Sequence, residues 1–351
     1  MKIGILTFHW ATNYGAVLQC YALQTYLEGK GHEVEVIDYK PRQYDDTLWS
    51  FIRYRKFVNI KEYQNNKRKE AAIEEFRAQR LKRSKRIYTC AEIGEIAGKY
   101  DAIISGSDQV MNPSFLVSGE GKGVVTPSYF LGFPFNGKRI GYALSFGCVK
   151  YPEKAREIAS RYIKDFDVIT VRESTGVDIV KSMGRDDAVV VPDPTLLMDG
   201  EFYRNLAGEK ICLKGDYVYC FFIRNIAERR ESIGRVLDGA PAVWNNDDGD
   251  FTMEGWLAKI RDAKFVVTDS FHCVVMCLKL HRPFAVVTEL AGNVGMNDRL
   301  YTLLGRVGLQ NRVVEKSKCD TIPELFDKEI NWSAVDNELR SWMEISDKIL
   351  G

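Results

Sequence analysis

The sequence contains few of the side chains that bind metal ions or form disulfide frameworks. Only four histidines occur in 351 residues, and none of the eight cysteines belongs to a Cys-x-x-Cys pair. Because a zinc site needs several such ligands at suitable spacing, we predict no metal site. Cysteines scattered in this way are typical of reduced, mostly buried thiols.

Long apolar runs and two familiar sequence signatures are also missing. No segment approaches the roughly 20 apolar residues of a membrane-spanning helix. The opening segment MKIGILTFHW has too short an apolar run for a signal peptide and lacks its cleavage pattern, so we expect a cytoplasmic protein. The three-glycine dinucleotide fingerprint is absent as well, which argues against NAD as a cofactor.

Basic and acidic residues are nearly equal in number but unevenly distributed. The net charge is +1, whereas residues 40–86 contain 15 Lys and Arg against 6 Asp and Glu, so the rest of the chain carries −8. A basic helical stretch can attract an anionic membrane or an acidic glycan carrier, although a solvated helix is the simpler interpretation. No aromatic motif is interleaved with these charges, so nucleic acid is not an expected partner.

Segments typical of strands and helices alternate in both halves of the chain. Residues 2–8 predict a strand, Ala16–Lys30 a helix and Glu33–Asp38 a second strand, an opening typical of nucleotide-binding α/β units. A long helix is predicted from about Ile60 to Ser84, within the basic stretch. The same alternation restarts in the second half of the chain, which indicates a second unit of the same class.

The chain length favours two domains, because 351 residues exceed the usual size of one hydrophobic core. We therefore expect an α/β protein with two Rossmann-like domains, residues 1–200 and residues 201–351. Residues 40–86 form a basic helical insertion in the first domain. The second domain ends in a predicted helix over Trp332–Leu350, which we expect to pack back on the first domain.

The stretch Phe265–Phe284 combines a buried strand with a helix start that suits an anion. Small polar residues follow the strand and cap the helix, which places His272 in its first turn. A helix N-terminus beyond the carboxyl end of a strand presents N–H groups to a phosphate or carboxylate. His272 could then add a proton or a hydrogen bond. The alternative is that Asp269, Ser270 and His272 only cap the helix.

Further segments carry small or functional side chains next to predicted strand ends. Glycines there allow a ligand to approach backbone N–H groups, and an arginine can bind a carboxylate or phosphate in bidentate fashion. Each segment also has a structural explanation: a tight turn, a surface ion pair between Arg172 and Glu173, a turn-forming aspartate or a helix start. The segments are His9, Asn13-Tyr14-Gly15, Gly106-Ser107-Asp108-Gln109, Arg172, Asp193, Asn297 and Arg299.

Five segments of the sequence resemble the successive motifs of the polysaccharide pyruvyl transferase family, in that family's order. They are NYGAVLQCYAL, IISGSDQVMNP, ITVRESTGVDIV, VVPDPTLLMD and FVVTDSFHCVVMCLKLHRPF. The resemblance implies two Rossmann-like domains facing a cleft, as in type B glycosyltransferases. It also implies transfer of pyruvate as a ketal from phosphoenolpyruvate to a sugar. Met111 stands where tryptophan is usual, and Cys273 stands where a small residue is usual.

The resemblance implies roles for the residues singled out. His272 is the general acid, either Asp108 or Asp193 is the general base, and Arg172 binds the carboxylate or phosphate of the donor. Neither a metal nor a cofactor is needed, because phosphoenolpyruvate is the donor substrate. The remaining substrate-binding residues are Asn13, Tyr14, Gly15, Gly106, Ser107, Gln109, Ser270, Asn297 and Arg299.

The expected partners are phosphoenolpyruvate and a sugar acceptor, lipid-linked or nucleotide-linked, in a precursor of a bacterial-type surface polysaccharide. The basic insertion adds peripheral contact with an anionic membrane as a further expectation. Two other functions stay open: a type B-fold glycosyltransferase that uses a nucleotide sugar, and a non-catalytic glycan-binding protein. The sequence makes no prediction about the oligomeric state.

Overall fold

The chain folds into two compact units. The computed structural model describes residues 1–44, 60–117, 125–209, 216–237, 239–289, 292 and 297–351. Unit 1 contains Met1–Leu197 and Ile345–Gly351, and unit 2 contains Met198–Glu344. The division falls three residues before the boundary expected after residue 200.

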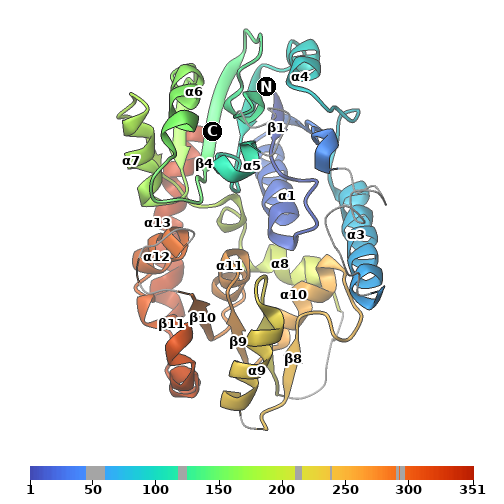
Figure 1. The fold of residues 1–351 in the computed structure, drawn as a ribbon, viewed down its shortest axis with the longest axis vertical. Coiled ribbons are helices and arrows are strands. Elements are labelled where there is room, and N and C mark those ends of the chain that lie inside the picture. Colours follow the sequence, from blue (N-terminus) through green and yellow to red (C-terminus); the bar gives the residue numbers. More distant parts are fainter. Residues whose placement is uncertain (45–59, 118–124, 210–215, 238, 290–291, 293–296) are drawn as a thin grey trace. The chain divides into compact units, whose positions relative to one another are not determined.

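Unit 1 is built on a parallel six-stranded sheet with the strand order β2-β1-β3-β4-β5-β6 (Figure 1). Strands buried on both faces need continuous apolar runs, and β3 is fully buried along its length. The strands are β1 (Lys2–Leu6), β2 (Glu33–Val36), β3 (Ala102–Ser105), β4 (Lys138–Leu144), β5 (Val168–Val171) and β6 (Val189–Val190). The helices are α1 (Tyr14–Gly29), α3 (Ile60–Arg80), α4 (Cys90–Ala97), α5 (Pro113–Val117), α6 (Glu153–Ile163) and α7 (Ser174–Ser182).

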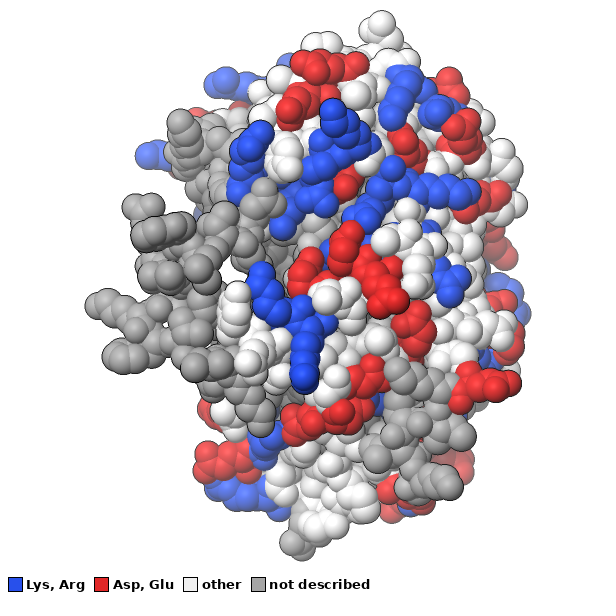
Figure 2. Space-filling view, turned by 90° about the vertical axis from the view of Figure 1, so that its right-hand side faces the viewer, with Lys and Arg blue, Asp and Glu red and all other residues white. Residues whose placement is uncertain are grey.

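The described parts of the basic insertion are residues 40–44, α3 and the segment that follows α3, while residues 45–59 lie outside the described residues. The expected helix end at Ser84 is wrong, because α3 ends at Arg80. Backbone bonds explain this early end: Val36 donates to Lys82 and Ser84 donates to Val36, so the chain here runs beside β2. On the face of unit 1 that carries α3, Lys and Arg side chains lie next to Asp and Glu (Figure 2).

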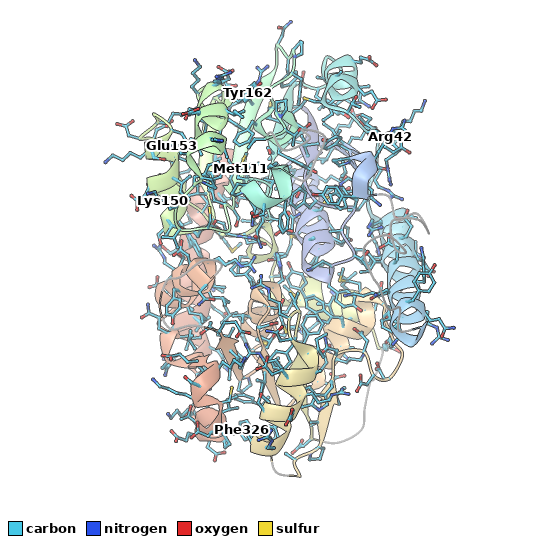
Figure 3. All side chains as sticks on the ribbon, in the orientation of Figure 1. Arg42, Met111, Lys150, Glu153, Tyr162 and Phe326 are labelled. Carbon is cyan, nitrogen blue, oxygen red and sulfur yellow. The ribbon has the colours of Figure 1, made fainter. Side chains whose placement is uncertain are left out.

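A large apolar core fills unit 1. Met111, which stands where the family commonly has tryptophan, is fully buried in this core (Figure 3). Aromatic rings in this core pack edge to face, as Phe8 and Tyr129 do with ring centroids 4.9 Å apart. Met111 thus fills core volume, and its backbone N–H donates to Ser145.

Unit 2 contains a parallel five-stranded sheet with the order β11-β10-β9-β7-β8. Its core includes Phe265 and Phe326, whose ring centroids lie 4.6 Å apart (Figure 3). The strands are β7 (Val218–Phe221), β8 (Ala242–Trp244), β9 (Phe265–Thr268), β10 (Phe284–Thr288) and β11 (Val313–Glu315). The helices are α8 (Gly200–Ala207), α9 (Ile226–Leu237), α10 (Met253–Asp262), α11 (Phe271–Lys279) and α12 (Asp298–Arg306).

The last helix, α13 (Trp332–Leu350), begins in unit 2 and ends in unit 1. Its final turns bond to unit 1 through Ser346, whose Oγ lies 2.8 Å from the Tyr142 hydroxyl, and through Asp347, which pairs with Lys30 at 2.6 Å. Within the described ranges, no helix is long and apolar enough to cross a membrane.

Candidate functional site

The loop after β3 approaches the backbone of β4 so closely that only glycine fits at its start. Gly106 has a φ of 111°, and a Cβ there would meet the Tyr142 carbonyl oxygen at 2.2 Å. Asp108 follows with a φ of 68°. Because β3, β4, β5 and β6 are neighbours and parallel, their carboxyl ends bring this loop together with Arg172 and Asp193.

Asp193 is the centre of a buried hydrogen-bond network. Its Oδ2 accepts from Arg172 Nη1 and from Ser107 Oγ, each at 2.9 Å. Its Oδ1 accepts from the backbone N–H of Thr195 at 3.0 Å and from the Thr195 hydroxyl at 2.6 Å. Asp193 also caps the short 3₁₀ helix Pro194–Leu196, which confirms the structural explanation of a turn-forming aspartate. Its contacts with Arg172 and Ser107 are additional to that role.

Arg172 is buried among three carboxylates. Its side chain is 1% exposed, so the ion pair with Glu173 that the sequence offered as an alternative is present, but it is buried and does not lie on the surface. Besides Asp193, Arg172 has Asp108 Oδ1 at 3.7 Å and Glu173 Oε2 at 3.8 Å. Burial opposes the charge, but the three carboxylates outweigh it and raise the pKa of Arg172.

The two aspartates proposed as general base differ in exposure. The side chain of Asp193 is 0% exposed, whereas that of Asp108 is 16% exposed. Asp108 can therefore reach solvent, and Asp193 has its oxygens occupied by four donors. Gln109 is mostly buried and accepts from Asn112 Nδ2 at 2.7 Å, which gives it a structural contact.

The loop between β1 and α1 carries the Asn13-Tyr14-Gly15 segment. Asn13 is the N-cap of α1, and its Oδ1 accepts from the backbone N–H groups of Gly15 at 2.9 Å and Ala16 at 3.4 Å. Tyr14 is buried. This loop is connected to the loop after β3, because Gln19 donates to the Thr7 hydroxyl and Thr7 donates to the Ser107 carbonyl oxygen, each at 2.9 Å.

Two residues of this network, Thr7 and Thr195, were not among the predicted site residues. Thr7 was predicted only as part of a strand, and Thr195 only as part of the loop after β6. The available signal was position, since Thr7 lies near the end of a predicted strand and Thr195 lies in the segment VVPDPTLLMD, two residues after the candidate Asp193. His9, a sequence candidate for ligand contact, is buried and bonds Asp38 Oδ1 at 2.9 Å and the Thr7 carbonyl oxygen at 3.1 Å.

In unit 2, the segment after β9 joins two neighbouring strand ends. Ser270 caps α11, because its Oγ accepts from the backbone N–H of Cys273 at 3.4 Å. Asp269 instead accepts from the backbone N–H groups of Ile223 at 2.8 Å and Arg224 at 3.2 Å, in the loop after β7. Its burial raises the pKa of Asp269. The loop after β7 was not among the predicted site segments, although it follows a predicted strand.

His272 lies in the first turn of α11, as the sequence predicted, and is 6% exposed. Its ring meets Phe271 edge to face, with centroids 5.3 Å apart. The guanidinium of Arg299, on α12, lies 5.6 Å from the Phe271 ring centroid, so Arg299 is placed beside this helix start. Asn297 donates to the Gly292 carbonyl oxygen at 3.4 Å.

The predicted site residues thus fall into two groups, one at the strand ends of each unit. The unit 1 group contains Asn13, Tyr14, Gly15, Gly106, Ser107, Asp108, Gln109, Arg172 and Asp193. The unit 2 group contains Ser270, His272, Asn297 and Arg299. Within the ranges that the structure describes, no three His, Cys, Asp or Glu residues are grouped in a way that could hold a metal ion.

Comparison with known families decides the assignment. The sequence model of the family described as polysaccharide pyruvyl transferase matches residues 13–289. The chain belongs to the polysaccharide pyruvyl transferase family. This confirms the resemblance seen in the sequence and identifies a transferase that acts on a sugar or polysaccharide acceptor. No curated protein matches the chain.

Solved structures show the fold of this pyruvyl transferase family member. The UDP-GlcNAc 2-epimerase of Methanocaldococcus jannaschii is 12% identical, covers 98% of this chain and 100% of its own, and has a TM-score of 0.50. The Neisseria meningitidis UDP-GlcNAc 2-epimerase is 11% identical, with 99% and 100% covered and a TM-score of 0.48. The E. coli heptosyltransferase WaaC is 12% identical, with 99% and 98% covered and a TM-score of 0.38. The expected fold class, two Rossmann-like α/β domains of the glycosyltransferase type B kind, is confirmed.

Proposed function

We propose that the protein transfers pyruvate from phosphoenolpyruvate to a sugar as a cyclic ketal, in a precursor of a surface polysaccharide. Family membership over residues 13–289 supports the pyruvyl group and the polysaccharide acceptor. Phosphoenolpyruvate carries a phosphate and a carboxylate, so its site needs cations, helix N-termini and hydroxyl donors. Both units place such groups at the carboxyl ends of parallel strands, where ligands of α/β sheets bind.

The reaction needs one acid and one base. A proton added to the methylene carbon of phosphoenolpyruvate makes the neighbouring carbon electrophilic, and a sugar hydroxyl attacks that carbon as it loses its own proton. Phosphate then leaves, and a second sugar hydroxyl attacks the same carbon to close the ketal. Of the two hydroxyl protons lost, one replaces the proton given to the methylene carbon and the other leaves with phosphate.

For the donor, the proposed groups lie at the start of α11 in unit 2. His272 supplies the proton to the methylene carbon, because imidazole can carry a proton near neutral pH. Ser270 and the first N–H groups of α11 stabilise an anionic group of the donor. Arg299, held against Phe271, adds a positive charge beside them, and Asn297 belongs to the same group.

For the acceptor, we assign the base to Asp108 in unit 1 rather than to Asp193. Asp108 is the more exposed of the two, and its distance of 3.7 Å from Arg172 places it at the edge of the buried network. Asp193 and Arg172 are positioning residues in this assignment, because both are buried and bonded to each other at 2.9 Å. The sequence assigned Arg172 to the donor, and its burial among carboxylates supports the positioning role instead.

One observation carries the proposal: the motif residues of the matched family collect at the strand ends of each unit, with a histidine in the first turn of a capped helix. The test is incubation of the full chain with phosphoenolpyruvate and a panel of lipid-linked and nucleotide-linked sugars. We expect phosphate release that depends on one acceptor, with the pyruvate ketal found on that sugar by mass spectrometry.

The same panel separates the other two functions. Protection of the protein by a UDP- or GDP-sugar, with transfer of that sugar and no phosphate release from phosphoenolpyruvate, would identify a glycosyltransferase instead. Binding of a glycan without any transfer would identify a glycan-binding protein. Either result would overturn the proposal.

A further inference from the structure

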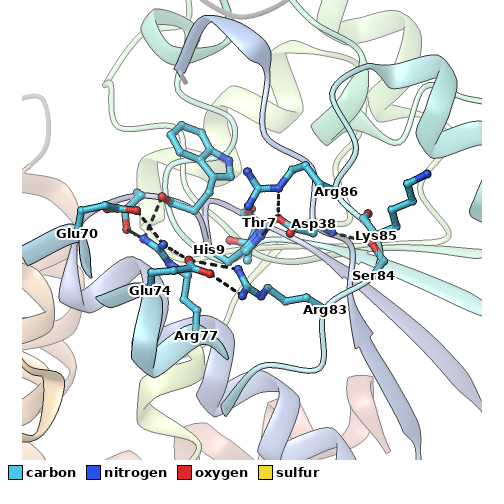
Figure 4. Close-up of polar contacts among 12 residues, drawn as sticks. Thr7, His9, Asp38, Glu70, Glu74, Arg77, Arg83, Ser84, Lys85 and Arg86 are labelled. Carbon is cyan, nitrogen blue, oxygen red and sulfur yellow. Dashed lines mark hydrogen bonds and ion pairs between the residues drawn. The ribbon is translucent and has the colours of Figure 1, made fainter. Parts of the chain in front are cut away.

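Helix α3, outside the family motifs singled out in the sequence, holds the loop that leads to Asn13-Tyr14-Gly15. Arg77 on α3 is 2% exposed, and its Nη2 donates to the carbonyl oxygens of Trp10 at 3.1 Å and Ala11 at 3.2 Å. Its Nη1 donates to Glu70 at 3.0 Å and to Glu74 at 2.6 Å, both on the same helix (Figure 4). The buried guanidinium is thus neutralised on α3 and bonded to the loop backbone.

Both ends of the loop are held. Glu70 also accepts from the Thr12 hydroxyl, which joins α3 to the residue just before Asn13. At the other end, the two ring nitrogens of His9 face only acceptors, Asp38 Oδ1 and the Thr7 carbonyl oxygen (Figure 4). The position of α3 relative to the start of α1 is therefore determined by bonds to loop backbone and side chains.

Lys69, next to Glu70, is placed by this arrangement over a motif residue. Its Nζ lies 4.8 Å from the ring centroid of Tyr14, and its side chain is partly buried. Among the residues that the structure describes, no carboxylate lies within ion-pair distance of Lys69 Nζ. Burial lowers the pKa of Lys69 to about 8, although the charge of Glu70 partly opposes this.

A partly buried ammonium group that forms no ion pair costs folding free energy, because burial removes part of its hydration and no direct partner replaces it. The cation–π contact with the Tyr14 ring offsets only part of this cost in folding free energy. An anionic oxygen group bound beside Lys69 would supply the missing charge. Lys69 would then lower the stability of the folded protein in exchange for binding, a trade-off that is common at functional residues.

We propose that α3 completes the substrate site of unit 1, with Lys69 binding a phosphate or carboxylate group of a substrate beside Tyr14 and Arg77 positioning the loop. This inference rests on the proposed function for the identity of the substrates. Phosphoenolpyruvate and the diphosphate of an activated sugar acceptor share this anionic chemistry. Lys69 contacts the substrate, and Arg77 acts through the loop.

The test measures binding to the full chain by isothermal titration calorimetry, with phosphoenolpyruvate and inorganic pyrophosphate as probes. The variants are Lys69→Met, Lys69→Arg and, as a matched control, Arg68→Met, which removes the same charge from an exposed neighbour on α3. We expect Lys69→Met to weaken at least one probe by about tenfold or more, as for loss of a hydrogen bond to a charged group. Lys69→Arg should keep part of the affinity, and Arg68→Met should change it little.

Stability separates binding from packing in the same variants. If Lys69 serves binding, Lys69→Met keeps or raises the melting temperature at pH 7, because a partly buried charge that forms no ion pair is removed. If Lys69 only packs on Tyr14, Lys69→Met lowers the melting temperature and leaves both affinities unchanged, which overturns the inference. Wild-type protein that binds neither probe overturns it as well.

The two probes identify the substrate group concerned. Weakened binding of phosphoenolpyruvate assigns Lys69 to the donor, and weakened binding of pyrophosphate alone assigns it to the diphosphate of an acceptor. Calorimetry does not require turnover, so Lys69-dependent binding without ketal formation would refute the proposed function and leave this site in place. Ketal formation with normal KM values in Lys69→Met would refute this site alone.

Discussion

At the residue scale, the two aspartates that the sequence analysis offered equally as the general base have different surroundings. Asp193 receives four hydrogen bonds and is 0% exposed, whereas Asp108 has its side chain partly in solvent. A base must accept a proton from the substrate, which a carboxylate with occupied oxygens does poorly. The charge of Asp193 instead compensates buried Arg172.

Asparagine substitutions should therefore act on different quantities. Asp108→Asn should lower kcat roughly 10²–10⁴-fold, the usual cost of removing a positioned general base, with little change in melting temperature. Asp193→Asn removes a charge from the buried pair and should lower the free energy of unfolding by about 3 kcal/mol. Urea unfolding and phosphate release measure the two effects. An Asp108→Asn variant with full activity would remove Asp108 from the reaction.

His272 is separable from the cap of its own helix. Ser270 makes the capping bond of α11, so Ser270→Ala should cost about 1 kcal/mol of stability. His272→Ala should keep the fold and lower the rate of phosphate release roughly 10²–10⁴-fold, as for loss of a general acid. Melting temperature and kcat are compared for both variants. A His272→Ala variant that stays active but is destabilised would show that His272 has a structural role and not a catalytic one.

At the element scale, the structure shows how much of the basic charge around α3 is used internally. Arg77 and Arg83 pair with Glu74, Lys82 pairs with Glu28, and Arg86 pairs with Asp38 at 2.8 Å. These pairs reduce the positive charge available to a partner. Among the described residues of this stretch, Lys67, Arg68, Arg80 and Lys85 are exposed, and they contribute to the expected attraction to an anionic membrane.

The membrane prediction stays testable at this scale. We expect the protein to sediment with anionic lipid vesicles at low salt and to be released at high salt, because each exposed charge contributes about 1 kcal/mol at most and is screened by ions. Neutral vesicles are the control. A double variant, Arg80→Glu with Lys85→Glu, should weaken the sedimentation. If the wild type shows no binding at low salt, the basic stretch is simply solvated.

At the scale of the whole molecule, the last turns of α13 belong to unit 1, although this helix begins in unit 2. The buried Tyr142 hydroxyl lies 2.8 Å from Ser346 Oγ and 3.1 Å from the Pro192 carbonyl oxygen, just before Asp193. Its burial raises the pKa of Tyr142, so the hydroxyl stays protonated. The C-terminal turns of the chain therefore complete the surroundings of the unit 1 network.

Removing the Ser346 hydroxyl should destabilise unit 1. Ser346→Ala leaves the buried Tyr142 hydroxyl with one partner fewer and should cost about 1–3 kcal/mol. Ser341→Ala, at an exposed position on the same helix, should cost at most about 0.5 kcal/mol. Urea unfolding gives the cost, and hydrogen exchange should show faster exchange around β4 in Ser346→Ala only. Equal behaviour of the two variants would show that the contact contributes nothing.

The sequence by itself determined the local features of both units. The alternation of apolar runs predicted β9 and α11, and the polar residues between them predicted the helix start, because periodicity and capping depend on neighbours within a few residues. The motif order predicted the family that the comparisons confirm. The end of α3 was missed, because pairing beside β2 stops this helix at Arg80.

Only the tertiary structure decided which of these residues act on one another. Burial and counter-charge come from residues far apart in the chain, as when Ser107 and Arg172 meet on Asp193 or Arg77 bonds the Trp10 backbone. These contacts depend on the strand order of the sheet, and no local sequence pattern encodes that order. For this reason the sequence could name Asp108, Asp193 and Arg172 but could not separate the exposed carboxylate from the buried one.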